Sequence, residues 1–162
     1  MNLITAMKKL HADNFTFYLK SHKYHWNIEG PNFREYHKFL NKIYVESWED
    51  VDSIAEQIRA LDTYANGSLE SFKDLTTITE DDKVPSALEM LKILYDDLDI
   101  VLNSIKDAYK EAEKYKELGL SNFLQDICMI AAKRPAGCFA LPLNIKINNT
   151  TYLWRLINGY PI

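Results

Sequence analysis

Four side chains in the first third of the chain have the types that bind transition metals: His25, His37, Asp52 and Glu56. Imidazole combined with carboxylate suits Fe(II) or Zn(II), and carboxylates also stabilise Fe(III) after oxidation. Each residue taken singly has an ordinary alternative. An Asp and a Glu four residues apart are common on a solvated helix face, and a histidine near a helix end often acts as a hydrogen-bonded cap.

The spacing of these residues determines how they could meet. Asp52 and Glu56 are four residues apart and therefore project from one face of a helix. His37 precedes Asp52 by fifteen residues, which is roughly 22 Å along a helix, so one subunit cannot bring the two together. If two copies of this helix pair antiparallel about a two-fold axis, His37 of one subunit lies beside the carboxylates of the other. The spacing thus predicts a metal site between subunits.

A second stripe of side chains on the same predicted helix fits this pairing. It lies roughly 80 to 100° from the apolar core stripe. Its members are Asn41, Val45, Trp48, Asp52, Glu56 and Arg59. Because large apolar side chains such as Val45 and Trp48 are unusual on the exposed surface of a monomer, the stripe favours a dimer interface.

Apolar residues recur at three- and four-residue steps through four segments, which predicts four helices. The first covers residues 3–24 and ends near His25, and the Gly30-Pro31 pair then breaks the chain. The second begins after an N-cap at Asn32 and is stopped by Asn66-Gly67. One or two helical turns are expected over 68–75 and an acidic loop over 76–83.

The third helix is predicted over 87–115, with Pro85 in its first turn, and the fourth begins at Ser121. Long helices joined by short connections pack as an all-α, antiparallel four-helix bundle, here with a short helix in the long connection between helices 2 and 3. The periodicity fails after Ala132. We therefore expect one bundle domain over 1–132, a truncated fourth helix, and an atypical tail over 133–162 that is not a separate domain.

Composition narrows the function classes. The chain has 162 residues, 47% of them hydrophobic, and a net charge of −4, which is typical of one globular domain and excludes disorder of the whole chain. No apolar run has the length of a membrane span, no signal peptide is recognisable, and Cys128 and Cys138 form no disulfide framework. We expect a cytoplasmic protein. The negative charge argues against strong binding to nucleic acid.

The run HKYHWNIEGPNF at 22–33, then His37, then DSIAEQIR at 52–59 closely resembles the Dps mini-ferritins. Their pattern is HWN-x-x-G-x-x-F, a histidine twelve residues after the first, and D-x-x-A-E-R-I. The resemblance covers about residues 3–126. It implies a ferritin-like bundle assembled on two-fold dimers as a hollow dodecamer, a ferroxidase that oxidises Fe(II), preferentially with hydrogen peroxide, and stores ferric oxyhydroxide. Such a protein protects against oxidative damage.

Transferred residue by residue, the resemblance implies that His25 and His37 of one subunit, with Asp52 and Glu56 of its partner, are the catalytic iron ligands. Zinc is a plausible substitute ion. Trp26 occupies the position of the aromatic residue that takes up stray oxidising equivalents, although a packing role fits it equally well, and Trp48 is a second auxiliary residue. The E-x-x-H repeat of full-size ferritins is absent from this chain.

The chain also departs from the family pattern. Asn41 replaces an acidic residue, which predicts a weaker second iron position, and the Lys-rich N-terminal arm is missing. We therefore predict weak or absent DNA binding, with a nucleoid location only if DNA is bound. The alternative function is a non-catalytic, DNA-compacting or structural helical assembly whose metal site is idle or holds zinc.

Three further expectations concern other parts of the chain. Residues 127–162 lack the family's basic, Trp-containing ending, and we hypothesise that a frameshift produced them. Iron would enter through a pore lined by acidic residues near the end of the third helix: Glu111, Glu113 and Glu117. His11 is expected on the surface, and His22 is expected to pack near the site rather than bind the metal.

Overall fold

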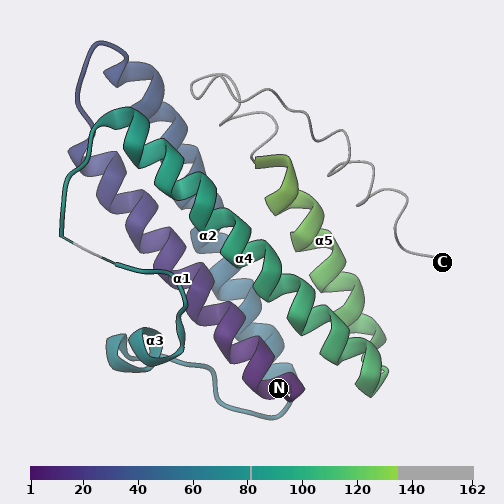
Figure 1. Ribbon diagram of the computed structural model, residues 1–162. Coiled ribbons are helices and arrows are strands. Elements are labelled where there is room, and N and C mark those ends of the chain that lie inside the picture. Colours follow the sequence, from purple (N-terminus) through teal and green to yellow (C-terminus); the bar gives the residue numbers. More distant parts are fainter. Residues whose placement is uncertain (81, 135–162) are drawn as a thin grey trace.

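The computed structural model describes residues 1–80 and 82–134, and these residues form five α-helices and no strand. The helices are α1 (Leu3–Asn27), α2 (Phe33–Ala60), α3 (Leu69–Leu75), α4 (Ala87–Tyr115) and α5 (Leu118–Arg134). The four long helices lie side by side, and α3 lies outside the bundle, in the connection between α2 and α4 (Figure 1). The predicted four-helix bundle with a short connecting helix is confirmed.

The turn between α1 and α2 follows from local chemistry. The Asn2 side chain caps α1 by accepting a hydrogen bond from the Thr5 amide at 2.8 Å. Gly30 has φ = 115°, a conformation that residues with a side chain rarely adopt, so the chain reverses there. Asn32 is the N-cap of α2, as predicted; its side-chain amide donates to the Tyr36 hydroxyl at 3.4 Å and makes no capping hydrogen bond to the helix backbone.

The structure corrects two predicted helix boundaries and the predicted place of Pro85, whereas α4 has the predicted bounds of 87–115. Helix α2 ends at Ala60, before Asn66-Gly67, because Asp62 adopts φ = 55° and its amide bonds back to Arg59. Pro85 lies outside α4, since Ser86 is the N-cap and forms a capping box with Glu89. Helix α5 begins at Leu118 rather than Ser121, because the Ser121 amide already bonds to the Glu117 carbonyl.

The core lies where the apolar stripes of the long helices meet. Its largest fully buried side chains are Met7, Leu10, Phe17, Leu40, Ile43, Ile54, Ile58, Met90, Leu91, Leu94 and Leu98. Burying one such side chain contributes roughly 2 kcal/mol. Helix α5 spans 17 residues, whereas α1, α2 and α4 span 25, 28 and 29. The expectations for Cys138 and for the tail from 135 onward lie outside the described residues.

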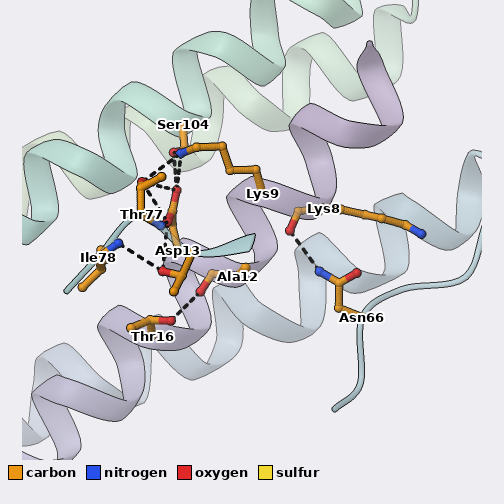
Figure 2. Close-up of polar contacts among 10 residues, drawn as sticks. Lys8, Lys9, Ala12, Asp13, Thr16, Asn66, Thr77, Ile78 and Ser104 are labelled. Atoms are coloured by element: carbon orange, nitrogen blue, oxygen red, sulfur yellow. Dashed lines mark hydrogen bonds and ion pairs between the residues drawn. The ribbon is translucent and has the colours of Figure 1, made fainter. Parts of the chain in front are cut away.

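A buried carboxylate anchors the end of the α2–α4 connection (Figure 2). Asp13, which is fully buried, accepts hydrogen bonds from the Thr77 amide at 2.6 Å, from the Ser104 hydroxyl at 2.5 Å and from Lys9 Nζ at 2.6 Å. These donors come from α1, from α4 and from the connection, so one side chain ties three segments together. Because its charge is paired and hydrogen-bonded, the buried group is tolerated.

Two further polar contacts hold the same connection against α1. The Asn66 side-chain amide donates to the Lys8 carbonyl at 3.0 Å (Figure 2). Lys20 forms a buried ion pair with Asp97 of α4 at 2.6 Å and also donates to the Thr79 carbonyl at 2.6 Å. The connection is therefore attached at its start and at its end, which places α3 over α1.

The position of α3 explains why the surface prediction for His11 is wrong. The Phe72 ring of α3 stacks on Phe15 at 4.0 Å and meets His11 edge-on at 5.2 Å. His11 is only 2% exposed, and neither ring nitrogen has a hydrogen-bond partner among the described residues. Burial lowers the pKa of His11 from 6.5 to about 4. None of the described helices is both long and apolar enough to cross a membrane.

Candidate metal centre

His25 near the end of α1 and His37 near the start of α2 form a closely packed pair. Their rings stack with centroids 3.7 Å apart. His25 Nδ1 lies 3.0 Å from the His37 carbonyl oxygen, and His37 Nδ1 lies 3.1 Å from the His25 carbonyl oxygen. Because a carbonyl oxygen only accepts, each Nδ1 must carry a proton, so in the uncharged ring Nε2 is the nitrogen that keeps its lone pair. The pair is thus arranged to offer two Nε2 atoms as ligands.

The electrostatic surroundings of His25 favour the same neutral form. The side chain is 9% exposed, and burial lowers its pKa. The hydrogen bond to the His37 carbonyl opposes this change, while the nearby His37 ring adds to it. Since a metal binds only the deprotonated nitrogen, a lowered pKa widens the pH range over which His25 can bind one.

Aromatic rings surround the histidine pair on both helices. Phe33 stacks on His37 at 4.9 Å, and Trp26 lies 4.1 Å from His22 with 63% of its surface exposed. His22 itself stacks on Tyr44 of α2 at 3.9 Å. His22 therefore packs in this layer, as expected. Tyr44 was missed as a neighbour of the site because its spacing along α2 also fits the core stripe.

The two carboxylates lie elsewhere on the single chain. Asp52 and Glu56 are exposed on α2. They lie toward the C-terminal end of this helix, whereas His37 lies near its start. Within the described residues, no three His, Cys, Asp or Glu side chains gather closely enough to hold a metal ion. The structure therefore brings His25 and His37 together, but it does not bring Asp52 or Glu56 to them.

The stripe predicted as a dimer interface is exposed along α2. Val45 and Trp48 are 40% and 52% exposed, and they are among the large apolar side chains that the single chain leaves uncovered. The polar members of the stripe are also exposed: Asn41, Asp52, Glu56 and Arg59.

The acidic residues predicted to line a pore lie at the end of α4 and, for Glu117, just beyond it. Glu111 is 9% exposed and pairs with Lys114 at 2.6 Å, whereas Glu113 and Glu117 are exposed. Their role in a pore stays a prediction.

Comparison with known proteins agrees with this fold. Residues 4–129 match the family described as the ferritin-like domain. The DNA protection during starvation protein of Helicobacter pylori is 31% identical over 119 residues, which cover 73% of this chain and 76% of that protein. An uncharacterized low temperature-induced protein of Nostoc is 34% identical over 115 residues, which cover 70% of this chain but only 64% of that protein.

Solved structures show the same relationship. The Dps protein of Vibrio cholerae superposes with a TM-score of 0.78 at 27% identity, covering 81% of this chain and 82% of that one. Dps from Listeria monocytogenes gives a TM-score of 0.83 over 89% and 94% of the two chains, and at 19% identity it supports the fold alone. The chain therefore belongs to the ferritin-like proteins. Within them, its homologues and structural neighbours place it in the Dps mini-ferritin family.

Proposed function

We propose that this protein is a ferroxidase that binds Fe(II) between two subunits, oxidises it preferentially with hydrogen peroxide, and stores the product in a hollow oligomer, a dodecamer built on two-fold dimers. The observation that carries the proposal is the reciprocal hydrogen bonding of His25 and His37, which engages Nδ1 of each ring and so leaves Nε2 as the nitrogen that would bind a metal. Membership in the Dps family supports it, and the V. cholerae relative is described as one of the ferritin-like diiron-carboxylate proteins.

The proposed site combines residues of two chains. Antiparallel pairing of two α2 helices brings Asp52 and Glu56 of one subunit to the histidine pair of the other, with the exposed Val45 and Trp48 side chains near the two-fold axis. The histidines supply neutral nitrogen ligands, and the carboxylates supply negative charge that favours Fe(III) over Fe(II). Zn(II) fits the same donors and would compete with iron.

The proposed reaction takes one electron from each of two Fe(II) ions. The O–O bond of hydrogen peroxide breaks, two protons are consumed, and two waters form, so that no hydroxyl radical is released. The Fe(III) then hydrolyses to ferric oxyhydroxide inside the shell, which removes both reactants of radical chemistry and protects against oxidative damage. Trp26 is exposed beside His22 and would take up a stray oxidising equivalent.

A complementation experiment tests the shared site. The variants His37→Ala and Asp52→Ala should each lose Fe(II) oxidation by peroxide, read as near-ultraviolet ferric absorbance, while far-ultraviolet circular dichroism stays unchanged. A mixed dimer of the two variants contains one site with both defects and one intact site. After dissociation and random reassembly, about a quarter of the wild-type sites should therefore return.

Two results would contradict this proposal. Absence of recovery in dimers shown to be mixed would mean that each site is built within one subunit. If the wild-type protein binds Zn(II) but does not oxidise Fe(II), the non-catalytic assembly is the correct function. An Asp74→Ala variant, which alters an exposed carboxylate of α3 outside the proposed site, is the matched control and should oxidise iron normally.

A further inference from the structure

A layer of stacked rings beside the histidine pair has no part in the mechanism above. His22 of α1 stacks on Tyr44 of α2 with centroids 3.9 Å apart and planes 11° apart. The Tyr44 ring in turn lies 5.0 Å from the His25 ring at an angle of 60°. We propose that Tyr44 and His22 form a bracket that orients the His25 ring for metal binding, with Tyr44 as the positioning residue. This inference rests on the proposed function of His25 as a ligand.

Both rings of the bracket are tethered by polar contacts as well as by stacking. The Tyr44 hydroxyl donates to Asn41 Oδ1 at 3.0 Å, and His22 Nδ1 lies 3.3 Å from the Tyr18 hydroxyl. Neither Tyr44 nor His22 belongs to the buried core of the described residues, and each is only partly covered. Apolar burial alone would leave such rings free to change rotamer, whereas a tether at each edge restricts both of them.

His25 needs an additional constraint because its hydrogen bond is a single contact. The bond from Nδ1 to the His37 carbonyl selects the tautomer, but a ring held at one atom can still tilt about it. Stacking on His37 at 3.7 Å and contact with Tyr44 at 5.0 Å restrict that tilt from two neighbouring side chains. The direction of the Nε2 lone pair, which a metal requires, then depends on Tyr44. Residues that orient a metal ligand in this way typically change affinity by about 10- to 100-fold when they are replaced.

The test separates the ring of Tyr44 from its bulk and from its hydroxyl group. Tyr44→Leu keeps an apolar side chain but removes the ring, and we expect Co(II) to bind about 10-fold more weakly, with an altered Co(II) absorption spectrum. Tyr44→Phe keeps the ring and should restore most of the affinity. Tyr115→Ala, at an exposed tyrosine at the far end of α4, is the control. Light scattering on each variant ensures that proteins of equal assembly state are compared.

A second measurement needs no metal. A His25 ring that is free to tilt loses the hydrogen bond to the His37 carbonyl that selects its tautomer. Long-range ¹⁵N–¹H spectra at one fixed pH should therefore show His25 only as the Nδ1–H tautomer in the wild-type protein and as a mixture in Tyr44→Leu. The proposed bracket would be overturned if Tyr44→Leu bound Co(II) with wild-type affinity and showed a single His25 tautomer. It would also be overturned if Tyr44→Phe bound Co(II) as weakly as Tyr44→Leu. If the wild-type protein itself binds no Co(II), the proposed function fails, and the tautomer spectra still judge the bracket.

Discussion

We expect this protein to lose stability in mild acid because of His11, and we expect the substitution His11→Met to remove that loss. The histidine is 2% exposed, and neither ring nitrogen has a hydrogen-bond partner in the described part of the chain. Burial therefore lowers the pKa of His11 to about 4 in the folded protein, against 6.5 when the ring is solvated. The unfolded chain binds a proton first as the pH falls, so acid favours unfolding.

The size of the effect follows from these two pKa values. Stability is intact above about pH 7, falls as the pH drops through 6.5, and reaches its lower limit below about 4. The complete loss corresponds to roughly 3 kcal/mol, since one pKa unit is about 1.4 kcal/mol, and roughly 2 kcal/mol of it is reached at about pH 5. Met is flexible and of similar size, and it removes a buried donor whose lack of a partner costs roughly 1 kcal/mol at any pH.

Urea unfolding followed by circular dichroism provides the assay, with wild-type and His11→Met proteins compared at about pH 7.5 and about pH 5. Other titrating groups contribute equally to both proteins, so the difference between the two pH effects isolates His11. We expect that difference to be roughly 2 kcal/mol in favour of the variant. Equal losses in the two proteins would show that His11 finds a partner or solvent in solution, and the reasoning would then be refuted.

Three further substitutions test other contacts. Lys20→Met leaves the buried Asp97 carboxylate, whose pKa is raised by burial, without its cation. We expect the free energy of unfolding in urea to fall by about 3 kcal/mol and to recover largely in the double variant Lys20→Met/Asp97→Leu. Absence of recovery would exclude the ion pair as the cause. Asp13→Ala removes the acceptor of the Thr77 amide, so hydrogen exchange measured by mass spectrometry should accelerate over residues 76–78. Unchanged exchange would show that contacts other than Asp13 hold the connection. Trp48→Glu introduces a charge into the exposed α2 stripe and should dissociate the oligomer at unchanged helix content, whereas a full-size particle in light scattering would place the interface elsewhere.

The long helices were predictable because their signals are local. Apolar residues at three- and four-residue steps predict the four long helices, and all four are present. Most of their ends lie within a few residues of the predicted positions. The corrected boundaries, at Ala60 and Leu118, depend on which backbone groups bond to each other at a helix end. Residue type alone does not specify those bonds.

Burial of polar residues was the least predictable feature. His11 looks like a surface residue in the sequence, because the helix that covers it begins nearly sixty residues later. The anchors that hold this covering segment, at Asp13 and Lys20, also join residues far apart in the chain. Long-range contacts of this kind leave no periodic pattern in the sequence.

For the candidate site, the sequence by itself determined the ligand types, the turn at Gly30, and the distance that separates His37 from Asp52 along one helix. These properties depend on residue chemistry and on the constant rise of a helix. Only the tertiary structure decided that His25 and His37 exchange hydrogen bonds with each other's carbonyl groups and that Tyr44 lies against His25. Such contacts require two helices at a particular separation and rotation, which the packing of the whole core sets.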